Sequence, residues 1–211
     1  MMADETPMPG SGDAALRAAA ERAETTRARN LPQWDDLPIP NDTANLRAGA
    51  SLHDACLALL PLIGVWRGEG EVVYPTIEPR QFGQQITFAH DGRPFVFYES
   101  RAWILDADGK VVRPAAREVG WWRPQPDDTI ELLLAQATGI IEIFYGEPRT
   151  QTSWELATDI TMRTSSAKEV SGAKRLYGLV NNGDLAYVEE RAMMDQPLQP
   201  HTSAYLRRIA G

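Results

Sequence analysis

The chain has 211 residues, of which 43% are hydrophobic and 24% are charged, and its formal net charge is −8. This length and composition are typical of a globular protein with one sizeable core. The negative charge argues against nucleic acid and anionic membrane surfaces as partners, because both are bound through basic surfaces. No segment approaches the length of a membrane span.

The cellular compartment is predicted from two features. Cys56 is the single cysteine, so no disulfide can form within the chain. Met1–Thr6 carries neither the basic segment nor the apolar run of a secretory signal. We therefore expect a cytoplasmic protein.

The first fifty residues lack the patterns of a packed domain. Residues 1–12 are rich in Pro, Gly, Ser and Met, which predicts disorder. Ala14–Glu24 predicts a frayed helix with little apolar surface to bury, and residues 31–51 predict an extended linker. Residues 1–50 are therefore expected to form a disordered or loosely packed N-terminal extension, followed by a folded domain over residues 51–211.

The folded domain begins with one short helix and continues with strands. Leu52–Leu62 is apolar and predicts a helix that runs into the first strand. After it, apolar residues recur with a period of two, as at Trp154 and Leu156. Turn signals such as Asp108-Gly109 separate the expected strands. These are residues 64–74, 82–88, 95–105, 112–122, 129–135, 140–145, 151–164, 174–180, 184–192 and 202–209. About ten short strands without long helices predict an all-β fold, an antiparallel up-and-down β-barrel whose interior can hold a ligand.

One motif stands out in the first strand, G-x-W-x-G-x-G at Gly64, Trp66, Gly68 and Gly70. Glycines that alternate along a strand leave one face bare, which indicates a bend, a bulge or the close approach of another backbone. Trp66 adds a large ring beside the bare positions, as where an opening strand closes a small barrel. Trp66 and Trp154 are also expected to line the barrel cavity.

Further segments follow the motif in a fixed order. Tyr74–Ile77 reads Y-P-T-I, Phe88–Pro94 forms a turn, and Gln196–His201 reads Q-P-L-Q-P-H before the last strand. This ordered set resembles the nitrobindin family, haem-binding β-barrels related in shape to fatty-acid-binding proteins. The resemblance covers about Leu59–Arg208.

The resemblance implies a haem b site. It makes His201 the proximal ligand of the haem iron, and neutral imidazole is a common axial ligand of haem. It also gives haem contacts to Lys168, in the segment A-K-E-V, and to Thr76 and Ile77. The implied activity is that of a peroxynitrite isomerase, which converts peroxynitrite to nitrate at a ferric, five-coordinate iron and also binds nitric oxide. No catalytic side chain beyond the haem iron is implied.

Other polar residues are assigned structural roles. His53 is expected at the surface, and His90 is expected to make a hydrogen bond in the turn that begins at Asp91. Glu189 and Glu190 are adjacent in a strand, so they face opposite sides and cannot form an acid/base pair.

A second function is compatible with the same barrel pattern. Without metal, the protein would be a non-catalytic carrier of fatty acids or other apolar molecules. The barrel pattern does not separate the two functions, whereas His201 in its segment favours haem. The oligomeric state, monomer or homodimer, stays open at this point.

Overall fold

The computed structural model describes residue 36 and residues 38–180 and 183–211, and Ile39–Gly211 form one compact unit. The predicted disorder of residues 1–12 and the predicted helix at residues 14–24 lie outside the described residues. A short 3₁₀ helix, η1 (Asp54–Leu62), precedes the strands. The strands are β1 (Gly64–Tyr74), β2 (Ile77–Ala89), β3 (Val96–Leu105), β4 (Val111–Pro124), β5 (Ile130–Gln136), β6 (Ile140–Thr150), β7 (Ser153–Arg163), β8 (Val170–Leu179), β9 (Leu185–Met193) and β10 (Gln199–Ala210).

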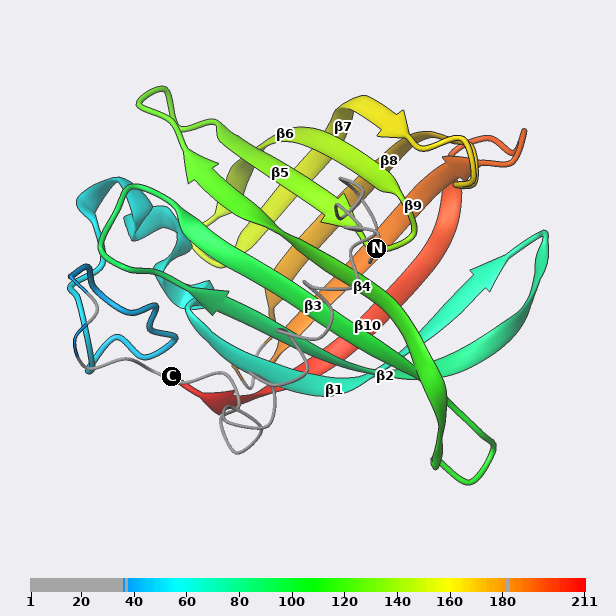
Figure 1. Ribbon diagram of the computed structural model, residues 1–211, viewed down its shortest axis with the longest axis horizontal. Coiled ribbons are helices and arrows are strands. Elements are labelled where there is room, and N and C mark those ends of the chain that lie inside the picture. Colours follow the sequence, from blue (N-terminus) through cyan, green and yellow to red (C-terminus); the bar gives the residue numbers. More distant parts are fainter. Residues whose placement is uncertain (1–35, 37, 181–182) are drawn as a thin grey trace, which may run out of the picture. The chain divides into compact units, whose positions relative to one another are not determined.

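The ten strands form one closed antiparallel barrel (Figure 1). Each strand pairs with its neighbours in the sequence, and β1 also pairs with β10, for example through Gly68 opposite Leu206. Closure leaves no unpaired sheet edge, and hairpin connections alone give the up-and-down order. The predicted ten-stranded up-and-down barrel with a short helix at its start is confirmed.

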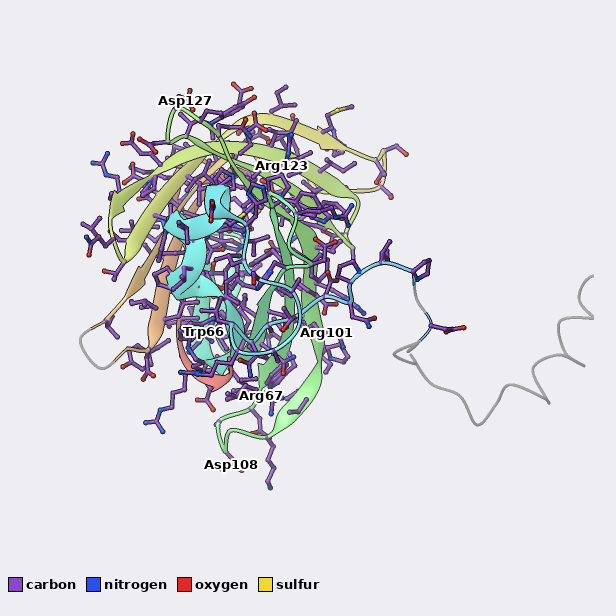
Figure 2. All side chains as sticks on the ribbon, turned by 90° about the vertical axis from the view of Figure 1, so that its left-hand side faces the viewer. Trp66, Arg67, Arg101, Asp108, Arg123 and Asp127 are labelled. Atoms are coloured by element: carbon purple, nitrogen blue, oxygen red, sulfur yellow. The ribbon has the colours of Figure 1, made fainter. Side chains whose placement is uncertain are left out.

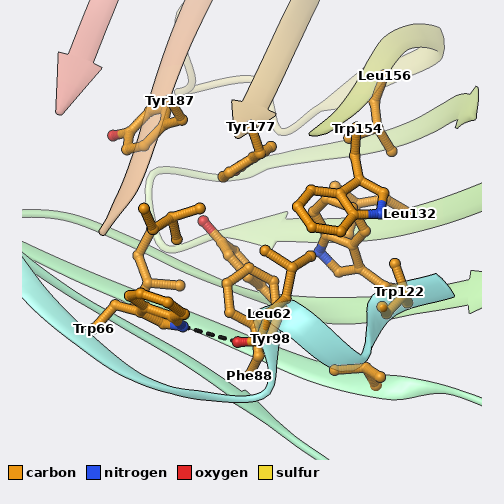
Figure 3. Packing of buried hydrophobic residues seen from close by; sticks show 14 of the residues in the cluster. Leu62, Trp66, Phe88, Tyr98, Trp122, Leu132, Trp154, Leu156, Tyr177 and Tyr187 are labelled. Carbon is orange, nitrogen blue, oxygen red and sulfur yellow. Dashed lines mark hydrogen bonds between the residues drawn. The ribbon is translucent and has the colours of Figure 1, made fainter. Parts of the chain in front are cut away.

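The two ends of the barrel differ. At the end where β1 begins, η1 places Cys56, Leu59 and Leu62 in the apolar core. Figure 3 shows the aromatic side chains of this core, including Trp122 and Trp154. The Trp154 indole N–H donates to the carbonyl of Ala58 in η1 at 3.0 Å. Packing and hydrogen bonding therefore close this end, while the opposite end carries the hairpin turns that follow the odd-numbered strands.

The G-x-W-x-G-x-G motif joins η1 to the barrel wall. Trp66 lies at the η1 end of the barrel (Figure 2), is fully buried, and its indole N–H donates to the carbonyl of Leu62 at 2.8 Å (Figure 3). The guanidinium group of Arg208 lies over its ring. A Cβ atom on Gly68 would lie 2.1 Å from the carbonyl oxygen of Tyr205, and on Gly70 it would lie 2.2 Å from that of Ser203. The glycines therefore permit a close approach of the β10 backbone, which is one of the three features that their spacing predicted.

A segment before η1 is also attached to the barrel. Thr43 and His90 exchange two backbone hydrogen bonds, of 2.7 and 2.9 Å, in an isolated antiparallel bridge. Thr43 belongs to the region predicted as a loosely packed extension. The boundary at residue 50 therefore stays a prediction, with one point of attachment on its N-terminal side.

Candidate functional site

A cavity of about 650 Å³ fills the barrel interior at the end opposite η1. Its wall takes residues from both sides of the barrel, including Phe82 on β2, Ile104 on β3 and His201 on β10. The volume lies in the range of small-molecule and cofactor sites. This end is hollow, whereas the large aromatic side chains of the core occupy the η1 end.

His201 lies at an irregularity of β10. Pro200 pairs with Glu190 and Thr202 pairs with Glu189, so His201 is the extra residue of a β-bulge. Bulges redirect side chains and are enriched next to active sites. Pro200 suits this position because it has no backbone N–H to contribute to a regular ladder. The bulge places the His201 ring at the wall between the inner cavity and a second hollow of about 420 Å³ that exposed Val188 and Leu176 help to line.

Two residues of β1 hold the His201 ring. The Nδ1 atom lies 3.2 Å from the carbonyl oxygen of Val73. Tyr74 meets the ring edge-on, with the ring centroids 5.3 Å apart. The Tyr74 hydroxyl is itself fixed, because it accepts a hydrogen bond from the Met193 N–H at 2.9 Å and lies 3.1 Å from the carbonyl oxygen of Arg191. The imidazole therefore has a defined orientation.

The contact with Val73 also fixes the tautomer of His201. A carbonyl oxygen only accepts, so Nδ1 carries the proton and donates, and Nε2 keeps its lone pair. Burial lowers the pKa of His201, and the charge of Glu189 opposes this shift. His201 is thus a neutral imidazole near pH 7, with Nε2 in the state that ligates a metal.

The other predicted contact residues divide into two groups. Ile77, at the start of β2, and Lys168, in the loop between β7 and β8, line the same cavity as His201. Lys168 is exposed, as a rim position requires. Thr76 is exposed in the turn between β1 and β2 and is absent from the described residues that line the cavity.

A buried ion-pair network lies along the inner part of the cavity. Arg175 pairs with Glu118 at 2.7 Å and also with Glu189, while Arg191 pairs with Glu189 at 2.8 Å and with Glu142 at 3.3 Å. Although burial alone would raise it, the two guanidinium groups lower the pKa of Glu189 to about 2. Burial raises the pKa of Glu142. The network therefore combines firmly ionised groups with one carboxyl that resists ionisation.

Three other sequence expectations concern side chains away from the cavity. His53 caps η1, with Nδ1 accepting from the Ala55 N–H at 3.1 Å. The expected turn hydrogen bond of His90 is wrong, because both of its buried ring nitrogens lack a partner among the described residues. Trp66 and Trp154 do not line the cavity, since both belong to the core beneath η1.

The closed up-and-down barrel and its internal cavity define a small-molecule-binding β-barrel, and the neutral histidine in the wall indicates a metal-containing ligand. The family described as THAP4-like, haem-binding β-barrel domain matches residues 55–208. The chain belongs to this family, which includes the nitrobindins.

Relatives and a solved structure agree with this assignment. A ferric nitrobindin-like protein of Saccharopolyspora erythraea is 61% identical over the full length of both chains. Peroxynitrite isomerase 1 of Mycobacterium marinum is 57% identical, with 96% of this chain and 94% of that protein covered. The crystal structure of Rv2717c from M. tuberculosis has a TM-score of 0.67 and 35% identity, and covers 75% of this chain and 99% of that chain.

The residues present fit a haem group. The cavity offers apolar wall residues such as Ile77, Phe82 and Ile104, a neutral imidazole whose Nε2 keeps its lone pair, and a cationic rim at Lys168. A porphyrin needs these three elements, for its macrocycle, its iron and its propionates respectively. Sequence reasoning missed Val73 and Tyr74, which hold the ring, and the ion-pair network.

Proposed function

We propose that this protein holds haem b through Nε2 of His201 and isomerises peroxynitrite to nitrate. The observation that carries the proposal is the state of His201, a neutral ring oriented by the Val73 carbonyl at the wall of a 650 Å³ cavity. The name of the M. marinum relative, peroxynitrite isomerase 1, supports the reaction.

The chain's own contribution is to bind the haem and to orient its axial ligand. His201 supplies one axial ligand, Val73 keeps the proton on Nδ1, and Tyr74 stops the ring from rotating. Ile77 and Lys168 take up the macrocycle edge and a propionate. Haem bound in this way supplies an iron centre with one open position at which an anion can bind. The haem contact expected for Thr76 rests on the family resemblance alone.

The side of the cavity away from β10 would leave room for such an anion. Its wall includes the small side chains Ala102, Ala115 and Ala116, next to Pro114. His201 is the one histidine among the described residues that line the cavity, so no second imidazole is placed there to hydrogen-bond dioxygen. This composition favours reaction with peroxynitrite over reversible oxygen carriage, and we propose nitric oxide binding at the same position.

The cellular location and the oligomeric state of the protein accompany this proposal. Within the described residues, no helix is both long and apolar enough to cross a membrane. We propose a cytoplasmic location, in keeping with the single cysteine. For the oligomeric state, monomer and homodimer both stay predictions.

The function is tested with purified, haem-loaded ferric protein. Stopped-flow mixing with peroxynitrite should show faster decay and a higher nitrate yield than the haem-free protein gives. Cyanide, which competes for the open iron position, should remove the acceleration, and nitric oxide should shift the Soret band. Tight uptake of fatty acids by a protein that binds no haem would instead establish the carrier function.

A further inference from the structure

Three tyrosines lie together where the cavity meets the core. Tyr98 and Tyr187 line the cavity, and Tyr177 is fully buried behind them (Figure 3). The rings of Tyr177 and Tyr187 are stacked, with centroids 5.2 Å apart. The cluster lies beside the proposed peroxynitrite site. This position matters because phenols, like indoles and thiols, are the protein groups that one-electron oxidants attack most readily.

Tyr98 has a proton acceptor within hydrogen-bonding distance. Its hydroxyl donates to Oε2 of Glu118 at 3.1 Å, and Glu118 lines the same cavity. Burial raises the pKa of Tyr98 well above its usual value, so the phenol stays protonated. Loss of an electron from Tyr98 therefore has to be accompanied by transfer of its proton, and the hydrogen bond supplies the route.

The surrounding charges allow Glu118 to take that proton. Arg175 pairs with two carboxylates, those of Glu118 and Glu189. Glu189 also pairs with Arg191, so it bridges the two guanidinium groups. If Glu118 becomes neutral, Glu189 stays within ion-pair distance of both arginines, so neither guanidinium group is left unpaired.

Aromatic contacts extend from this cluster into the core. Phe88 lies 5.3 Å from Tyr98 and 5.7 Å from Trp122, and Trp122 lies 5.4 Å from Tyr177, measured between ring centroids. The rings are in van der Waals contact and are all buried. Tyr98 is thus buried, with Phe88 against its ring at the edge of this aromatic cluster.

We propose that Tyr98 is an internal trap for one-electron oxidants formed in the cavity, with Glu118 as its proton acceptor. The inference rests on the proposed function, because peroxynitrite is the source of such oxidants through the nitrogen dioxide radical. The radical takes one electron from Tyr98 and becomes nitrite, the phenol O–H bond breaks, and the proton passes to the Glu118 carboxylate. The products are nitrite, a tyrosyl radical and a neutral Glu118.

The same chemistry makes Tyr98 a modification site. A second nitrogen dioxide radical can combine with the tyrosyl radical at the ring carbon next to the hydroxyl-bearing carbon. A C–N bond then forms and the ring proton is lost, which gives 3-nitrotyrosine. Tyr145, which points outward from β6 and is 48% exposed, gives a comparison residue in the same chain.

The test uses the full-length, haem-loaded ferric protein and hydrogen peroxide, which oxidises ferric haem without any isomerisation of peroxynitrite. Freeze-quench electron paramagnetic resonance should show a tyrosyl radical in the wild type. Tyr98→Phe keeps the ring against Phe88 and should lose most of that signal, while Tyr187→Phe, at the other tyrosine of the cavity wall, should keep it. Glu118→Gln retains Tyr98 but should also lose most of the signal, because the proton acceptor is gone.

Peroxynitrite is then used to map nitration by mass spectrometry. Tyr98 should be nitrated in haem-loaded protein in preference to Tyr145, and Tyr98→Phe should change the ratio of nitrite to nitrate. Soret and circular dichroism spectra establish that each variant is folded and loaded. A radical that survives in folded Tyr98→Phe, or nitration confined to Tyr145, overturns the trap. Absence of accelerated nitrate formation in the wild type counts against the proposed function alone.

Discussion

The three histidines of the chain show how strongly local surroundings separate residues of one type. His53 caps η1, and His201 projects from a bulge toward the cavity. His90 is buried at the η1 end, where its ring has no hydrogen-bond partner among the described residues. The sequence motif around His201 led to a residue that lines the cavity, and its role as the haem ligand stays a prediction. Its hydrogen bond to Val73 could not be predicted, because it depends on the alignment of strands 128 residues apart.

At the same scale, Lys168 should tune haem affinity without controlling it. An exposed charge contact is typically worth at most about 1 kcal/mol, so Lys168→Ala should weaken haem binding a few-fold in a titration followed at the Soret band. Lys174→Ala is the matched control, because Lys174 pairs with Glu155 and lines the second hollow of about 420 Å³ instead of the cavity. Equal affinities for the two variants would remove Lys168 from the site.

Among the elements, the alternation of apolar and polar residues predicted the strands well, because one face of each strand is buried in the barrel. The ion-pair network was missed for the same reason. Glu189 and Arg191 occupy inward positions of β9 that alternation assigns to apolar side chains. Their partners, Arg175 and Glu142, come from β8 and β6, so pairing emerges only when the barrel is closed.

The contact of β1 with β10 leads to a prediction about stability. Gly68→Ala places a Cβ against the β10 backbone, and overpacking of this kind costs about 1–3 kcal/mol in free energy of unfolding. Gly172→Ala in β8 is the control, because a Cβ there meets nothing within 4 Å. Urea unfolding of the haem-free protein should show the loss for Gly68→Ala alone. Equal midpoints would mean that the wall tolerates a side chain at Gly68.

For the whole molecule, the division of the barrel into a packed η1 end and a hollow end could be predicted only in part. The apolar helix and the strand count indicated a closed end and an interior of ligand size. Which tryptophans fill the core was not predictable, because Trp66 and Trp154 are placed by hydrogen bonds to the η1 carbonyls of Leu62 and Ala58.

The predicted domain boundary is tested by two shortened chains. A chain starting at Ser51 loses the Thr43–His90 bridge, whereas one starting at Ile39 keeps it. Each lost hydrogen bond costs about 1 kcal/mol, so the shorter chain should unfold at lower denaturant but bind haem with unchanged affinity. Weaker haem binding by the shorter chain would place residues 39–50 among the groups that shape the site.

The most direct test of the account is haem titration of His201→Ala. If His201 is the proximal ligand, the variant should keep the circular dichroism spectrum of the barrel and lose most of its haem, since the remaining contacts are largely apolar and non-directional. His90→Ala, at the opposite end of the barrel, should bind haem like the wild type. A folded His201→Ala protein that binds haem as tightly as the wild type would contradict the assignment of His201.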